Sequence, residues 1–155
     1  MTEKVPHRSK INPDEMTADA VVLHCSDHRF QRSFHEFLTK SLKVDPYALL
    51  SIPGGGHFLP MEAMMSKYFK ICFQSLSFHA QRNRVRRVIL IGHHDCLFFK
   101  EQVRFYYFEP DLNQKQFANL RKARTILSER FPGLAVELYF ADADQNGSVR
   151  FLKVE

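Results

Sequence analysis

Two short apolar segments rich in β-branched residues each end in side chains that can bind a metal. Residues 21–23 precede Cys25, and residues 88–91 precede His93 and Cys96. Continuous apolar segments of this kind are typical of strands buried in a parallel sheet, and helical sequence follows each of them. Because the carboxyl ends of parallel strands share one edge of a sheet, we expect the three side chains to face one crevice. The pattern therefore predicts an α/β fold with a site at that edge.

Two thiolates and one imidazole form a ligand set with a clear metal preference. Sulfur and imidazole nitrogen together suit Zn²⁺, and three protein ligands leave the fourth tetrahedral position open for chemistry. Zinc in such a site lowers the pKa of a bound water towards neutrality. The alternative is that Cys25 and Cys96 are small buried apolar residues and His93 is a core histidine, which is common for single residues of these types. The joint pattern favours the metal site.

The order and spacing of the two motifs resemble a known signature. Cys25-x-Asp27-x-Arg29 followed by His93-x-x-Cys96 is similar to the zinc signature of the β-class carbonic anhydrases, and the similarity runs over most of the chain. The resemblance implies that Cys25, His93 and Cys96 bind one zinc ion per chain. It also implies a carbonate dehydratase, a zinc lyase that converts carbon dioxide reversibly to bicarbonate and a proton through a hydroxide on the zinc.

The same resemblance assigns Asp27 and Arg29 to a pair beside the metal. In the family the arginine holds the aspartate, which accepts a hydrogen bond from the hydroxide. Alternatively, a released Asp27 becomes a fourth zinc ligand and blocks the site. Both arrangements occur in the family, so the sequence leaves both open. The two residues could instead form a solvent-facing ion pair that caps the next helix, because aspartate is favoured at helix N-termini.

A glycine-rich loop follows the second predicted strand and resembles the loop that lies beside zinc in the family. Gly54, Gly55 and Gly56 allow positive φ and close approach of the backbone to a substrate or ligand, and they equally suit a tight strand-to-helix turn. The family typically has an Arg-Asn-Ala-Gly segment here, whereas this chain has Ile-Pro-Gly-Gly. Leu97 replaces the glycine that commonly follows the second zinc cysteine. These departures motivate a second interpretation, a catalytically inactive zinc-binding protein with a binding or regulatory role.

The chain as a whole predicts one domain, residues 18–155, behind an N-terminal arm, residues 1–17. The expected fold is a mostly parallel central sheet with flanking helices and an antiparallel C-terminal edge strand, as in the β-carbonic anhydrases. The aromatic residues 105–108 are expected in the core, and a wall of the active-site crevice or a dimer interface is the alternative. We expect strands at 19–25, 47–52 (buried), 88–92, 135–141 and 149–154, and helices at 31–42, 61–79 and 114–130.

Composition bears on location and on the class of partner. No apolar run is long enough to cross a membrane, and residues 1–14 lack the apolar core of a signal peptide. Three cysteines, of which Cys72 is expected in the core, suggest a reducing compartment and hence a cytoplasmic location. The net charge of +5 and the arginines within 82–87 permit acidic partners. No nucleic-acid-reading motif accompanies this charge, so nucleic-acid binding is a third and weaker interpretation.

Two further expectations concern assembly and proton transfer. Residues 61–79 are apolar over more than one helical face, which predicts burial against a second subunit and hence a homodimer or a larger assembly of dimers. In the resembled family each crevice is partly walled by the neighbouring chain. Four histidines near the strand ends are candidates for proton shuttling, because the pKa of histidine lies near neutrality: His24, His28, His57 and His94.

Overall fold

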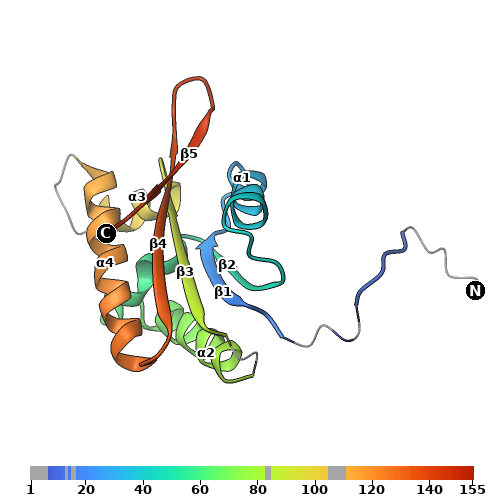
Figure 1. Ribbon diagram of the computed structural model, residues 1–155. Coiled ribbons are helices and arrows are strands. Elements are labelled where there is room, and N and C mark those ends of the chain that lie inside the picture. The colour runs from blue at the N-terminus through green and yellow to red at the C-terminus, as the bar shows by residue number, and fades with distance from the viewer. Residues whose placement is uncertain (1–6, 13, 15–16, 83–84, 105–110) are drawn as a thin grey trace, which may run out of the picture.

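The computed structural model describes residues 7–12, 14, 17–82, 85–104 and 111–155 and shows a three-layered α/β fold (Figure 1). One five-stranded sheet forms the middle layer, in the order β2-β1-β3-β4-β5. The first four strands run parallel, and β5 pairs antiparallel with β4 at one edge, which confirms the predicted fold. The strands are β1 (Ala20–Cys25), β2 (Tyr47–Ile52), β3 (Arg87–His93), β4 (Ala135–Ala143) and β5 (Val149–Lys153).

Helices cover both faces of the sheet (Figure 1). Helix α1 (Gln31–Glu36) and the π-helical turn η1 (Phe37–Ser41) lie on one face. Helices α2 (Ser66–Arg82) and α4 (Leu112–Arg130) lie on the other face, together with the 3-10 helix η2 (Gly55–Met61). The sheet is therefore shielded from solvent where its central strands run.

Side chains of the two central strands alternate between two separate cores. In β1, Leu23 packs toward α2 and α4, whereas Val22 packs toward α1. Strand β3 repeats this alternation, with Leu90 in the first core and Ile91 in the second. Successive side chains of a strand point to opposite faces, so a strand covered on both faces needs apolar residues at every position. This explains the unbroken apolar sequence of both segments.

Two predicted helices differ in the structure. The predicted helix 31–42 changes character in its second half, where the amide of Leu42 donates to the carbonyl of Phe37, five residues back, at 2.9 Å. That spacing defines a π-helical turn. The predicted helix 61–79 begins only at Ser66, because the 3-10 helix and a turn come first, and it continues to the end of α2.

The region after β3 contains helix α3 (Leu97–Arg104), for which no bounds had been predicted. Helix α4 begins two residues earlier than predicted. Asp111 caps this helix, since its side chain accepts the backbone N–H groups of Asn113 and Gln114 at 3.1 Å each. The predicted aromatic core segment 105–108 lies outside the described residues.

Strand β2 lies at an edge of the sheet, so the prediction that it is buried is wrong. It pairs with β1 alone in the described part of the chain, its side chains are mostly half-buried, and Leu49 is 46% exposed. The order of strands in a sheet depends on packing between distant segments. A six-residue apolar strand therefore has the same sequence pattern at the edge of a sheet as in its middle.

Residues 7–12 of the predicted arm are exposed, and the first described helix or strand begins at Ala20. The division into an arm of 1–17 and a domain of 18–155 stays a prediction. Among the described helices, none is both long and apolar enough to span a membrane.

Candidate metal centre

The three predicted ligands meet where β1 and β3 end. The register pairs His24 of β1 with Ile91 of β3, so the two strands reach the same edge of the sheet. Ligand atoms of Cys25, His93 and Cys96 all lie within 4.8 Å of one another, and all three residues are buried. The two sulfurs are 3.9 Å apart and are not bonded to each other. The fold thus presents three soft ligand atoms to one point.

The orientation of His93 leaves one ring nitrogen free for a metal. Nδ1 donates a hydrogen bond to the backbone carbonyl of His94 at 2.8 Å, which places the lone pair on Nε2. Nε2 is buried and has no hydrogen-bond partner among the described residues. A buried, unpartnered lone pair costs free energy unless an ion or a proton takes it. These residues therefore fit the zinc ion that the resemblance implies.

The two thiols create an environment that favours a thiolate. The hydrogen bond with Cys96 lowers the pKa of Cys25, and the same bond raises the pKa of Cys96. The backbone N–H of Gly54 donates to Sγ of Cys25 at 3.2 Å and lowers the pKa of this thiol further. One proton leaves the pair easily and the other is held by the resulting thiolate. A divalent metal would displace this second proton as well, because cysteine binds metals as thiolate.

The glycine-rich loop touches the site through its backbone. Gly54 and Gly55 have positive φ, +77° and +56°, in the region that favours glycine. A Cβ on Gly55 would lie 2.9 Å from the backbone nitrogen of Cys25, whereas a Cβ on Gly56 would meet only leucine side chains at 3.4 Å or more. The first two glycines thus satisfy a tight turn and a close approach to β1. Contact of this loop with a substrate stays a prediction.

Arg29 grips Asp27 with two parallel bonds. Nε donates to Oδ1 at 3.0 Å and Nη2 donates to Oδ2 at 2.7 Å. These bonds hold the pKa of Asp27 below its usual range, so the carboxylate is ionised at neutral pH. Asp27 does not belong to the metal-capable group of atoms defined above. Of the two arrangements left open by the sequence, the structure has Asp27 held by Arg29.

This pair does not cap the following helix. Helix α1 begins after Phe30, and no side chain caps it. Asp27 instead accepts the backbone N–H of Arg29 at 3.0 Å within the turn that precedes the helix. The side-chain amide of Gln31 braces the same turn by donating to the carbonyls of Cys25 and Asp27, at 2.9 and 2.8 Å. The turn therefore has a defined shape next to the first metal motif.

Two contacts of the site were missed by sequence reasoning. Arg29 also reaches Asp95 in the turn after β3, and Asp95 forms an ion pair with Lys100 of α3. On the other side, buried Gln116 of α4 donates to the backbone carbonyl of His93 at 3.1 Å and accepts from Nε2 of His57 at 2.8 Å. The sequence signals for the second contact are weak, because a glutamine such as Gln116 is ordinary in an amphipathic helix. Nothing near it in the sequence indicates that it contacts His57 and His93.

The four candidate proton shuttles separate into two pairs. His24 and His57 are buried, and burial lowers the pKa of both, to about 4 for His57. Neutral buried histidines that donate to fixed acceptors are poorly suited to exchange protons with solvent. His28 and His94, in contrast, line cavities that open to solvent. They stay candidates for proton transfer.

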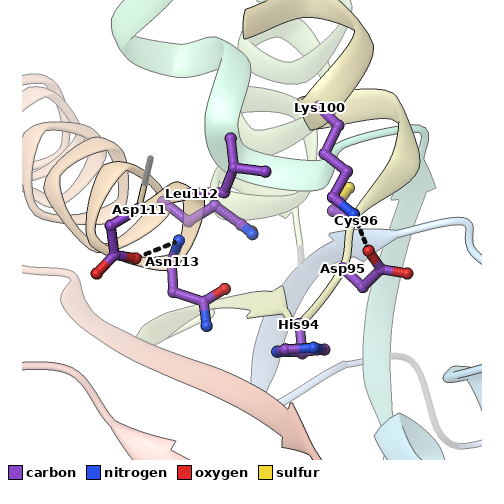
Figure 2. Close-up of a pocket in the computed structure, with 8 residues that line it drawn as sticks. His94, Asp95, Cys96, Lys100, Asp111, Leu112 and Asn113 are labelled. Carbon is purple, nitrogen blue, oxygen red and sulfur yellow. Dashed lines mark hydrogen bonds and ion pairs between the residues drawn. The ribbon is translucent and has the colours of Figure 1, made fainter. Parts of the chain in front are cut away.

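Two cavities flank the cysteines. One of about 320 Å³ is lined by Cys25, Asp27, Pro53, Leu97 and Phe98, among others, so it joins one predicted metal ligand, Cys25, to the ionised carboxylate and to an apolar wall. The second, of about 210 Å³, lies on the Cys96 side. Figure 2 shows its lining residues, which come from the turn after β3, from α3 and from the N-terminal end of α4 with its cap.

The basic cluster predicted within 82–87 lies away from this site. Arg86 and Arg87 line a cavity with Lys43 at the opposite end of β1 and β3, where these strands begin. Arg87 also forms an ion pair with Glu137 at 3.3 Å. Arg84 lies outside the described residues. Arg86 and Arg87 therefore take no part in the candidate metal centre.

Comparisons with known proteins agree with this fold. A family model described as "Putative carbonic anhydrase" matches residues 16–151. A comparison with curated proteins gives no match. One of two tetrameric β-carbonic anhydrases of the ascomycete Sordaria macrospora has a TM-score of 0.54 at 14% identity, covering 88% of this chain and 81% of that chain.

Two other solved structures show the same fold. The β-carbonic anhydrase CafA of Aspergillus fumigatus has a TM-score of 0.55 at 15% identity, over 90% of this chain and 77% of that one. The β-carbonic anhydrase isoform I of Trichomonas vaginalis has a TM-score of 0.50 at 13% identity, over 97% and 90%. At such identities the structural likeness establishes the fold alone.

Proposed function

This chain belongs to the carbonic anhydrase family whose model it matches over residues 16–151, and on that premise we propose that it hydrates carbon dioxide reversibly to bicarbonate and a proton. The observation that carries the proposal is the group of Cys25, His93 and Cys96, with ligand atoms within 4.8 Å of one another. An ionised carboxylate, that of Asp27, lines the same cavity as Cys25. The proposed enzyme is a zinc-dependent carbonate dehydratase.

Each residue has a role that its contacts support. Cys25 and Cys96 would hold one zinc ion as thiolates and His93 through Nε2, and the bound ion would supply the acidification of water. The carboxylate of Asp27 would accept a hydrogen bond from the attacking water and orient it. Arg29 would keep that carboxylate ionised and in place through its two parallel bonds.

The cavity beside Cys25 suits a small apolar substrate. Pro53, Leu97 and Phe98 supply apolar surface, and the charged groups of Asp27 and Arg29 lie at the same cavity. Carbon dioxide is linear and has no net dipole, so placing it against an apolar wall carries only a small desolvation penalty. Carbon disulfide shares these properties and is a second substrate to assay.

A second candidate function is a zinc-binding protein without hydratase activity. The observation that favours it is the loop after β2, which has Ile52 and Pro53 where the resembled family typically has arginine and asparagine. Leu97, which stands where glycine is common in the family, lines the cavity beside Cys25. This candidate predicts full zinc content and no hydration.

One experiment on one sample separates these functions. Metal content is measured by elemental analysis, and carbon dioxide hydration is followed by stopped flow with a pH indicator. About one zinc per chain together with hydration supports the proposed enzyme. Zinc without hydration of carbon dioxide or carbon disulfide supports the binding protein, and absence of stoichiometric zinc contradicts both.

We also propose that the protein forms a homodimer or a larger assembly of dimers. Three large apolar side chains lie exposed at seven-residue spacing along α2 and the turn before it: Met64, Ile71 and Phe78. Leu49 on the edge strand β2 is exposed as well. Exposed apolar residues spaced along one helix are typical of a surface that is covered by a partner.

A further inference from the structure

We infer that Asp95 and Lys100 are positioning residues that fix the guanidinium of Arg29 and, through it, the carboxylate of Asp27. The inference rests on the proposed function, in which Asp27 orients the attacking water. Neither Asp95 nor Lys100 is a defined position of the two motifs that indicate the metal site. Their role follows from contacts between the turns after β1 and β3.

Arg29 is held from two sides. On the β1 side its Nε and Nη2 bind the carboxylate of Asp27, as described above. On the β3 side Nη1 donates to Oδ2 of Asp95 at 3.2 Å, and Nη2 donates to the Asp95 carbonyl at 3.0 Å. The guanidinium is planar, so bonds along two of its edges prevent rotation unless several break together.

Lys100 holds the remaining carboxylate oxygen of Asp95. Its Nζ pairs with Oδ1, as Figure 2 shows. Arg29 pairs with the other oxygen, Oδ2. The charges therefore alternate in the order Asp27, Arg29, Asp95, Lys100. Lys100 lies one turn into α3, so the start of this helix is tied to the turn that carries the metal ligands.

The backbone at Asp95 is in a conformation that non-glycine residues rarely adopt. Its φ is +55°, in the left-handed region. The preceding amide, of His94, still donates to the carbonyl of Ala141 at 2.8 Å, so pairing with β4 continues up to this point. The sharp turn that follows directs both the carboxylate and the carbonyl of Asp95 at Arg29. Such conformations persist where surrounding contacts compensate their cost, and they cluster at functional sites.

Solvent exposure argues against a purely stabilising role. The side chains of Arg29, Asp95 and Lys100 are 40%, 35% and 41% exposed, so these ion pairs are screened and contribute little to the free energy of unfolding. The side chain of Asp27, in contrast, is 10% exposed. The main consequence of the Asp95 contacts is therefore the orientation of Arg29 toward Asp27.

The test is the variant Asp95→Asn, for which the chain offers matched controls. Asparagine adopts positive φ as readily as aspartate and has the same shape, so the turn is kept while the charge is removed. Glu36→Gln removes a carboxylate from exposed ion pairs with Arg32 of α1 and Lys40 of η1. Asp27→Asn provides the background for a double-variant cycle.

Asp95→Asn should lower kcat for carbon dioxide hydration by about tenfold with zinc content unchanged, and Glu36→Gln should leave kcat unchanged. In the Asp27→Asn background, Asp95→Asn should have no additional effect, because Asp95 acts through Arg29 on Asp27. Equal losses in both backgrounds overturn the inference, and so does an active Asp95→Asn variant with wild-type kcat.

NMR of the Arg29 side chain gives a readout that requires neither activity nor metal. The Nε–H of Arg29, assigned with an Arg29→Lys variant, should exchange slowly with water in the wild type and in Glu36→Gln. It should lose this protection in Asp95→Asn. Unaltered exchange overturns the inference even in an active enzyme. Lost protection supports it even if the wild type does not hydrate carbon dioxide, in which case only the proposed function fails.

Discussion

The backbone N–H of Gly54 donates a hydrogen bond to Sγ of Cys25 at 3.2 Å, so the loop after β2 is tied to the last residue of β1. This bond stabilises negative charge on the sulfur and fixes the direction of the thiolate. It exists because the next residue, Gly55, lets the loop pass close to the backbone of β1. The loop is therefore part of the scaffold of the candidate metal centre.

Gly55→Ala should destabilise the protein by about 2–4 kcal/mol. The new Cβ would lie 2.9 Å from backbone atoms of His24 and Cys25, and alanine is strained at a φ of +56°. Gly147→Ala is the matched control, because Gly147 also has positive φ but a Cβ there meets nothing within 4 Å. This control should cost about 1 kcal/mol. Urea unfolding measures both, and equal costs would show that the close approach to β1 is unimportant.

Purified protein should carry about one zinc per chain, and alanine at Cys25, His93 or Cys96 should abolish stoichiometric zinc. Cys72→Ala is the control, since Cys72 is as buried as the predicted ligands but lies on α2 in the hydrophobic core. Burial there raises the pKa of its thiol to about 12. It should lose some stability and keep its zinc. Elemental analysis decides the matter, and full metal in all three ligand variants would refute the assignment.

Arg29→Ala should keep zinc but lower the rate of carbon dioxide hydration by at least tenfold, which is about 1.4 kcal/mol of transition-state stabilisation. The reason is that Asp27 loses both parallel bonds and turns toward the metal position. Asp27→Asn should also lower the rate with zinc retained, because an amide is a poorer acceptor. Arg32→Ala, which removes an exposed arginine of α1 paired with Glu36, serves as the control. Wild-type rates in both site variants would remove the pair from the mechanism.

His57 should make the protein less stable as the pH falls. Burial lowers its pKa from 6.5 to about 4, so the unfolded chain takes up a proton more readily than the folded one. The contribution of neutral His57 is complete above pH 6.5 and is lost as the pH falls through 4, a difference of up to about 3 kcal/mol. His57→Gln, which cannot titrate, should lose less stability over that range. Parallel pH dependences of wild type and variant, measured by urea unfolding of metal-free protein, would contradict this.

Sedimentation should show a dimer or a multiple of it. The side chains of Ile71 and Phe78 are 51% and 53% exposed on α2, and covering them would remove apolar surface from water. A double replacement, Ile71→Asp with Phe78→Asp, should shift the assembly toward monomer while the circular dichroism spectrum is retained. A wild-type mass that stays monomeric at every concentration tested by analytical ultracentrifugation would rule out this assembly.

The sequence by itself determined where the sheet strands lie along the chain and which three residues form the candidate metal-binding group. The strands at β1 and β3 are recognisable because burial on both faces demands an unbroken apolar run, a requirement that acts residue by residue. Cys25, His93 and Cys96 could be grouped for a related reason. Parallel strands end at one edge, so side chains just past two such ends must be neighbours. The fold class and the family followed from these local patterns and the resemblance they carry.

Tertiary structure alone decided which residues support that group. Asp95 lies 66 residues from Arg29 in the chain, and Gln116 lies 23 residues from His93, yet both make hydrogen bonds to them. Sequence reasoning also did not predict three further features: the edge position of β2, the π-helical turn after α1 and the burial of His57. Each depends on how helices and loops pack across the sheet, and such contacts leave no periodic pattern along the chain. Local sequence therefore specified the candidate ligands, whereas packing selected the residues around them.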